Sequence, residues 1–128
     1  MKLLLDTHAL LWFLSNDPQL SAPARQHIEN PEHHKAVSAV SLWEIAIKLS
    51  LGKMTLPQPF AEVFPRQLEV NGFELLPVTC AHLNQILALP FHHHDPFDRL
   101  LIAQAMVDDM TIVTRDTEFP KYPAKLLW

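Results

Sequence analysis

Leu3-Leu4-Leu5-Asp6-Thr7, close to the start of the chain, is the stretch that decides the fold class. Three consecutive leucines closed by an acid are typical of a short strand that is buried on both faces of a parallel sheet. A helix is expected immediately afterwards, because apolar residues run from Leu10 to Leu14 before the turn cluster Ser15-Asn16-Asp17-Pro18 stops them. A buried strand followed at once by a helix predicts an α/β protein.

The same alternation continues along the rest of the chain. Further strands are expected at 36–38, 73–78, 111–114 and 125–128. Further helices are expected from a Ser21 cap to about residue 30, then over 39–51, 60–70 despite Pro65, 81–89 and 96–109. Strands that alternate with helices imply right-handed crossovers and a mostly parallel sheet with helices on both faces. No repeat or linker interrupts the pattern, so residues 1–128 are expected to form one domain.

The composition is that of a globular protein. Hydrophobic residues make up 48% and charged residues 19%, which is too apolar for a disordered segment. The net charge is 10 − 14 = −4 with neutral histidines, which argues against a protein that coats nucleic acid by bulk electrostatics. No apolar run is long enough for a signal peptide or an anchor, and the single cysteine, Cys80, cannot form an internal disulfide. A cytoplasmic protein without membrane contact is therefore expected.

Acids occur at positions where a parallel sheet would gather them. Asp6 closes the first strand and Asp116 lies just beyond the strand at 111–114, so both are expected at the carboxyl edge, where ligands bind in such sheets. Glu44 and Asp98 belong to the two most apolar helices, where an unpaired carboxylate is costly. Each also has a structural explanation. Asp6 or Thr7 could cap a helix, Glu44 could share a solvated stripe with Ser41 and Lys48, and Asp116 could form an Asx turn.

The segment Asp95-Pro96-Phe97-Asp98 contains two acids that differ in what explains them. Asp95 is well placed as a helix cap, with Pro96 at the first helical position. Asp98 at the third position would meet the helix dipole, but it also projects toward the carboxyl edge of the sheet. Capping therefore accounts for Asp95 almost completely and for Asp98 only in part.

Four acids without a partnering cysteine or histidine pair would form a hard, oxygen-only site. Such ligands suit Mg²⁺ or Mn²⁺ better than Zn²⁺. These ions commonly act on phosphates, where they polarise an oxygen and lower the pKa of a bound water. The run His92-His93-His94 lacks the ligand spacing of a zinc site, so we interpret it as a polar loop rim, with contact to a substrate phosphate as a second possibility.

Taken together, these segments resemble one known family, the PIN-domain ribonucleases of the VapC toxin type. The resemblance covers essentially the whole chain in order and rests on these stretches: Leu3-Leu4-Leu5-Asp6-Thr7-His8-Ala9-Leu10-Leu11-Trp12, Ser38-Ala39-Val40-Ser41-Leu42-Trp43-Glu44-Ile45-Ala46-Ile47-Lys48, His94-Asp95-Pro96-Phe97-Asp98-Arg99-Leu100-Leu101-Ile102-Ala103-Gln104-Ala105, Val113-Thr114-Arg115-Asp116 and Tyr122-Pro123-Ala124-Lys125-Leu126-Leu127-Trp128. It implies a three-layer α/β/α sandwich and an endoribonuclease that depends on Mg²⁺, with Mn²⁺ as a substitute. It also implies an RNA substrate, a cognate VapB-like antitoxin as partner, and a homodimer.

The resemblance also assigns roles to residues. The catalytic acids would be Asp6, Glu44, Asp98 and Asp116. Asp6, Asp98 and Asp116 would hold the metal, directly or through water, and Glu44 would complete the shell or orient the attacking water. The residues that would orient or bind substrate are Thr7, Thr114, Arg99 and Arg115, with a structural ion pair as the alternative for Arg99. Trp12, Phe13 and Trp43 are candidates for an apolar antitoxin groove, although core packing is the better expectation for Trp43.

Two other classes of protein remain as alternatives. A receiver-like signalling domain has similar length and an acidic Mg²⁺ pocket, but it needs a central phosphoacceptor, and no Asp occurs between Asp17 and Asp95. A catalytically silent interaction module, whose acids only cap and solvate helices, would bind no metal. Without the four candidate acids the charge is 10 − 10 = 0, so the acid excess equals the proposed site.

Overall fold

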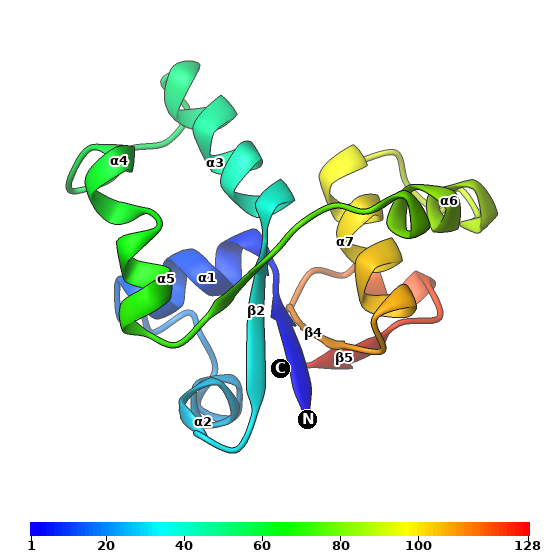
Figure 1. The fold of residues 1–128 in the computed structure, drawn as a ribbon, viewed down its shortest axis with the longest axis horizontal. Helices are drawn as coiled ribbons and strands as arrows, with labels where there is room; N and C mark the ends of the chain where they lie inside the picture. Colours follow the sequence, from blue (N-terminus) through cyan, green and yellow to red (C-terminus); the bar gives the residue numbers. More distant parts are fainter.

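A five-stranded sheet runs through the middle of the protein (Figure 1). The computed structural model describes all 128 residues. The strand order is β3-β2-β1-β4-β5, and each neighbouring pair is parallel. The strands are β1 (Lys2–Leu5), β2 (His34–Ser38), β3 (Glu74–Leu76), β4 (Thr111–Val113) and β5 (Lys125–Leu127). The α/β class and the parallel sheet predicted from the sequence are therefore confirmed.

Helices cover both faces of the sheet and make a three-layer sandwich (Figure 1). They are α1 (Thr7–Leu14), α2 (Ala22–Glu29), α3 (Ala39–Ser50), α4 (Phe60–Val63), α5 (Arg66–Val70), α6 (Cys80–Ala88), α7 (Pro96–Val107) and the short 3₁₀ helix η1 (Phe119–Lys121). Leu3 and Leu5 pack with α1, α2, α3 and α5, whereas Leu4 packs with α7 on the other face. Successive leucines of β1 thus enter opposite cores, as strand geometry requires.

Side-chain caps make the helices begin where the strands end. Asp6 caps α1 by accepting from the Ala9 amide, and Ser38 caps α3 by accepting from the Val40 amide. Asp95 caps α7, with Pro96 at its first position as expected. These caps place the first turns of α1 and α3 directly at the carboxyl ends of β1 and β2.

Two structural expectations were wrong. The segment 60–70 forms α4 and α5 rather than one helix, because Pro65 has no amide hydrogen to continue the ladder and Phe64 is extended. Trp43 does not pack in the core. Its side chain is 58% exposed and meets only the edge of the Phe97 ring, with ring centroids 5.2 Å apart.

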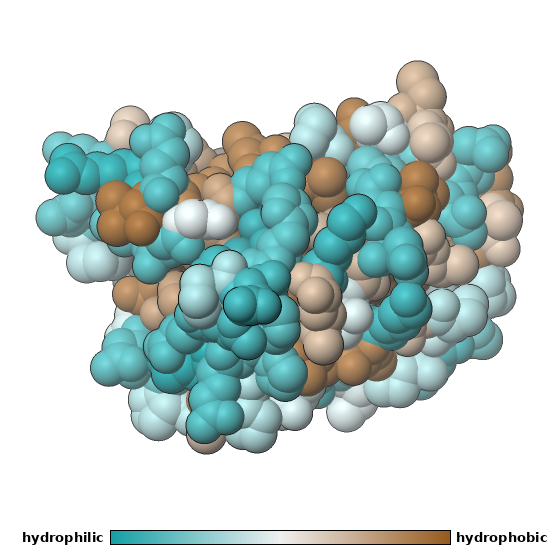
Figure 2. All heavy atoms as spheres, turned by 60° about the horizontal axis from the view of Figure 1, so that its bottom comes forward, coloured by the Kyte–Doolittle hydropathy of each residue, from teal (hydrophilic) through white to brown (hydrophobic).

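The face of the molecule drawn in Figure 2 is largely hydrophilic, with hydrophobic residues in small separate patches. The large aliphatic side chains gather instead in the two cores beside the sheet. None of the helices combines the length and the hydrophobicity that crossing a membrane would demand.

Candidate active site

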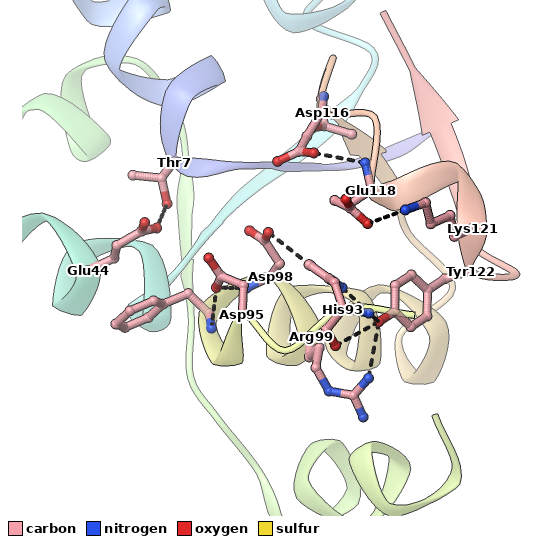
Figure 3. Close-up of polar contacts among 12 residues, drawn as sticks. Thr7, Glu44, His93, Asp95, Asp98, Arg99, Asp116, Glu118, Lys121 and Tyr122 are labelled. Atoms are coloured by element: carbon pink, nitrogen blue, oxygen red, sulfur yellow. Dashed lines mark hydrogen bonds and ion pairs between the residues drawn. The ribbon is translucent and has the colours of Figure 1, made fainter. Parts of the chain in front are cut away.

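The carboxyl edge of the sheet gathers the acids predicted from the sequence. Asp6 follows β1 and Asp116 follows β4, and these strands are neighbours, with the Asp6 amide donating to the Val113 carbonyl over 3.1 Å. Asp98 stands in the first turn of α7, and Glu44 lies on α3. Figure 3 shows Glu44, Asp98 and Asp116 around this edge. Four elements far apart in the sequence therefore supply one acidic region.

Asp6 is buried, and its carboxylate has structural partners. One oxygen, Oδ1, accepts from the Ala9 amide over 2.7 Å. Burial raises the pKa of Asp6 above its usual range, while hydrogen bonds from Thr114 and from the Ala9 amide oppose that shift. The charge of Asp116 raises the same pKa. Asp6 is thus both a helix cap, as one interpretation expected, and a member of the acid cluster.

Asp98 also has a strongly perturbed carboxyl group. Burial raises its pKa to about 7, the negative charge of Asp95 adds to the effect, and Asp116 raises it further. A hydrogen bond with His93, between Nε2 and Asp98 Oδ2 at 3.1 Å, acts in the opposite direction. A carboxyl group with this pKa is poised near neutrality, which is common in functional sites.

Asp116 and Thr114 form a turn after β4. The Asp116 amide donates to Thr114 Oγ1 over 3.1 Å, and the Glu118 amide donates to Asp116 Oδ1 over 2.9 Å. The Asx turn foreseen for Asp116 is therefore present, but it engages only one carboxylate oxygen. Thr114 is buried, and its hydroxyl connects the Asp116 backbone with the Asp6 side chain. Thr114 therefore helps to hold Asp6 and Asp116 close to each other.

Glu44 is only 8% exposed, although a solvated stripe was one explanation for it. That explanation was wrong, since Ser41 one turn earlier is fully buried as well. Glu44 Oε1 accepts from the Thr7 hydroxyl over 2.6 Å, and Oε2 accepts from Lys48 Nζ over 2.9 Å. The predicted pair with Lys48 does form. Glu44 is therefore held between two donors on the inner side of α3.

Asp95 behaves as the capping argument predicts. Its Oδ1 accepts from the Phe97 and Asp98 amides over 2.9 and 3.0 Å, and its side chain is exposed. Its charge nevertheless contributes to the raised pKa of Asp98. Asp95 thus shapes the acidic region without extending a free carboxylate into it.

The two candidate arginines have different environments. Arg99 is 4% exposed, and its Nη1 donates to the Pro90 carbonyl over 2.7 Å and to the Tyr122 hydroxyl over 3.1 Å. Substrate contact by Arg99 is excluded by this burial, and the alternative of an ion pair is also wrong, because its partners are neutral oxygens. Arg115 is exposed and lies over the Trp12 ring, 4.4 Å from its centroid.

A hollow of about 340 Å³ opens beside the acids, and it is lined by Asp6, His8, Trp12, Arg115, Asp116 and Thr117. It combines two carboxylates with an exposed guanidinium and an exposed imidazole. Arg115 also donates to Gln19 over 3.0 Å, so its position is partly fixed. The hollow can therefore receive an anionic group next to the acidic region.

His93 and Tyr122 belong to the site, although the sequence analysis did not single them out. His93 was interpreted as part of a polar loop rim, with contact to a substrate phosphate as a second possibility, yet its ring contacts both Asp98 and Tyr122. Tyr122 lies 29 positions away, and its hydroxyl is 2.7 Å from His93 Nδ1. The triple-histidine run was the available signal, but only the folded geometry shows which imidazole faces the acid.

The donor set fits a hard divalent cation in its chemistry. Asp6, Asp98 and Asp116 would provide oxygen ligands, and repulsion from Asp116 contributes to the raised pKa of Asp6 and Asp98, which a bound cation would relieve. As the side chains stand, no three acidic, histidine or cysteine groups are close enough to enclose an ion. Metal binding at this edge would therefore require the carboxylates to move closer together.

The family model that describes the PIN domain matches residues 3–125. This chain belongs to the PIN domain family. The PIN domain is 31% identical over 115 residues to Ribonuclease VapC22 of Mycobacterium tuberculosis, which covers 88% of this chain and 85% of that protein. The family resemblance described from the sequence motifs is thus confirmed.

Solved structures share the fold of this PIN domain. VapBC2 from Rickettsia felis, bound to a DNA fragment from its promoter, matches with a TM-score of 0.73 at 18% identity, covering 100% of this chain and 99% of that one. VapBC-5 from Mycobacterium tuberculosis, a member of the VapBC family of toxin–antitoxin systems, matches with a TM-score of 0.60 at 18% identity, covering 98% and 95%. At these identities the likeness establishes a common architecture.

Proposed function

We propose that this PIN domain is an endoribonuclease toxin that hydrolyses RNA with Mg²⁺, for which Mn²⁺ can substitute, and that a cognate VapB-like antitoxin inhibits it. The observation that carries the proposal is the convergence of Asp6, Asp98 and Asp116 at one edge of the sheet, where the charge of Asp116 contributes to the raised pKa of both Asp6 and Asp98. The relationship to a protein named a ribonuclease supports the reaction type. The free Cys80 agrees with a reducing cytoplasm as the place of action.

In this proposal each acid has a defined task. Asp6, Asp98 and Asp116 would hold the cation, which when bound polarises the scissile phosphate and lowers the pKa of a water. Glu44, held by Thr7 and Lys48, would orient the attacking water through its carboxylate. Thr114 holds Asp6 near Asp116 through its hydrogen bonds to the Asp6 side chain and the Asp116 backbone. Arg115 would bind a backbone phosphate at the rim of the hollow.

The test is RNA cleavage by purified protein in Mg²⁺, in Mn²⁺ and in EDTA, beside Asp6→Asn. Asparagine is a good helix cap, so the variant should keep α1 while losing a charge that the cation needs. We expect cleavage with metal, none in EDTA, and a loss of at least 100-fold in the variant at unchanged melting temperature. Cleavage in EDTA, or normal cleavage by Asp6→Asn, would contradict the proposal. A protein without cleavage or stabilisation by Mn²⁺ would instead be the silent interaction module.

We also infer that the antitoxin occupies an apolar groove beside α1. The groove has a volume of about 240 Å³ and is lined by Leu11, Leu14, Ser15, Leu56, Pro57, Gln58, Val63, Phe64 and Gln67. Trp12 and Phe13 are partly buried on the same helix. We expect the toxin itself to be a homodimer. Leu14→Glu should weaken inhibition by the antitoxin and leave RNA cleavage intact. Unchanged inhibition of that variant would place the antitoxin elsewhere.

A further inference from the structure

Four side chains form a continuous hydrogen-bonded row that ends at Asp98 (Figure 3). Arg99 Nη1 lies 3.1 Å from the Tyr122 hydroxyl, which lies 2.7 Å from His93 Nδ1. His93 Nε2 then lies 3.1 Å from Asp98 Oδ2. The row connects the buried interior with an acid of the candidate site.

The direction of hydrogen donation along this row is determined by its first member. Arginine can only donate, so the Tyr122 oxygen accepts from Arg99, and it also accepts from the His93 backbone amide over 3.3 Å. With both lone pairs engaged, the tyrosine hydrogen is left to donate, and His93 Nδ1 at 2.7 Å is a much closer acceptor than the His93 carbonyl at 3.5 Å. The ring hydrogen of neutral His93 is then on Nε2, and it is donated to Asp98 Oδ2. Asp98 Oδ2 therefore has a hydrogen-bond donor within the protein itself.

The base of the row is rigid, because it is buried and fully bonded. Tyr122 is 3% exposed, and Arg99 also donates to the Pro90 and Leu89 carbonyls. Exposure rises toward the site, to 13% for the His93 side chain and 20% for Asp98. The imidazole is thus anchored from below and meets the acid at the surface of the site.

Asp98 depends on this support more than the other two proposed ligands do. A backbone amide holds one oxygen of each of those, from Ala9 to Asp6 and from Glu118 to Asp116. The carboxylate of Asp98 has a single hydrogen-bond donor in the protein, His93, and its Oδ1 is free of such contacts. Removing the imidazole would leave this carboxylate free to rotate.

We propose that His93 is a positioning residue for Asp98, holding Oδ2 so that Oδ1 is presented to the cation. This inference rests on the proposed function, because the cation is part of it. Groups that orient metal ligands in this way commonly change metal affinity 10–100-fold when they are removed. Tyr122 contributes by directing the ring hydrogen of His93 to Nε2, so it acts on Asp98 through the imidazole.

The test compares Mn²⁺ affinity, measured by calorimetric titration of the metal-free protein, with melting temperature and RNA cleavage. His93→Ala should bind Mn²⁺ roughly 10–100-fold more weakly. Tyr122→Phe should weaken binding by a smaller factor, and His93→Gln, whose side-chain amide can still donate to Asp98, should recover part of the loss. The matched control is His94→Ala, because His94 is exposed and has no hydrogen bond. It should bind Mn²⁺ like the wild type.

A folded His93→Ala protein with wild-type Mn²⁺ affinity, or an equal loss in His94→Ala, would overturn the inference. Absence of both Mn²⁺ binding and cleavage in the wild type would refute the proposed function itself, so the two failures are distinguishable. A second measurement uses the metal-free wild-type protein, so it depends on no substitution. Imidazole ¹⁵N shifts of the wild type at pH 8.5 should show hydrogen on Nε2 of His93, and a ring with hydrogen on Nδ1 would contradict the proposed row.

Discussion

Thr7 donates its hydroxyl hydrogen to Glu44 Oε1 over 2.6 Å, and so joins the first turn of α1 to the middle of α3. Both residues are buried, and they are 37 positions apart in the sequence. The contact holds a carboxylate of α3 beside the strand end that carries Asp6. The hydroxyl of Thr7 thus acts on an acid, and its hydrogen is not free for substrate.

Removing that hydroxyl tests its role. Thr7→Val leaves a buried carboxylate oxygen without its donor, so we expect a loss of about 1–3 kcal/mol in the free energy of unfolding. RNA cleavage should fall at least 10-fold, because Glu44 is then held by Lys48 alone. Thr7→Ser keeps the donor and should retain most of both properties. A Thr7→Val protein that is as stable and as active as Thr7→Ser would show that the hydroxyl has no such role.

Asp98 predicts how the stability of the metal-free protein depends on pH. Its pKa is about 7 in the folded protein and near its usual value of 3.8 when unfolded. Between these values the folded state binds more protons at this carboxyl group, so its stabilising effect is complete below about pH 4 and disappears as pH rises through about 7. Unfolding by urea in EDTA should therefore show this loss between pH 5 and pH 8.

Asp98→Asn isolates that effect from all other titrating groups. The amide oxygen can still accept from His93, but it has no charge to bury. We expect the variant to gain stability relative to the wild type as pH rises from 5 to 8, while RNA cleavage is lost. A difference in stability that is the same at both pH values would contradict the raised pKa of Asp98.

The two arginines give opposite expectations. Arg115→Ala removes an exposed side chain, so the free energy of unfolding should change by less than about 0.5 kcal/mol while KM for RNA rises several-fold. Arg99→Lys removes a buried planar donor set, and we expect it to cost about 2–4 kcal/mol of stability. Urea unfolding and steady-state cleavage check both. A rise in KM without loss of stability for Arg99→Lys would instead indicate that Arg99 contacts the RNA.

Ser41 is buried, and its hydroxyl group lacks a hydrogen-bond partner in the protein. Ser41→Ala should therefore be neutral or stabilising within about 1 kcal/mol. The control is Ser38→Ala, because Ser38 Oγ donates to Gln104 over 2.6 Å and accepts from the Val40 amide over 3.0 Å. That variant should lose about 1–3 kcal/mol, and equal costs for the two serines would contradict the assignment.

Local pattern was enough to predict the sheet and most of the acids' positions. Leu3-Leu4-Leu5 had to be a doubly buried strand, and Asp95 followed by Pro96 had to begin a helix. Asp6 and Asp116 then reach one edge, because β1 and β4 are parallel neighbours. The strand and the helix start are thus predicted from residues close together in the sequence, and the parallel sheet class then places both acids at its carboxyl edge.

What could not be predicted depends on contacts between distant residues. The partners of Arg99 are carbonyl oxygens and Tyr122, and no sequence pattern marks them. The ring of His93, which contacts Asp98, is held by Tyr122, a residue that follows β4 in the sequence. Trp43 is exposed because it lies on the outward side of α3, which it shares with the exposed Ala46 and Ser50. Periodicity describes one helix at a time and does not reveal such neighbours.

The pairing of β4 with β1 bears on how such an enzyme is made. A ribosome adds Asp6, Glu44 and Asp98 well before it adds Asp116, and chains grow at about 5–20 residues per second. The edge that gathers the acids is complete only when β4 has been synthesised and has aligned with Leu3, Leu4 and Leu5. A nascent chain therefore has no assembled acidic edge until β4 and Asp116 have been synthesised, and no cleavage is expected before that point of translation.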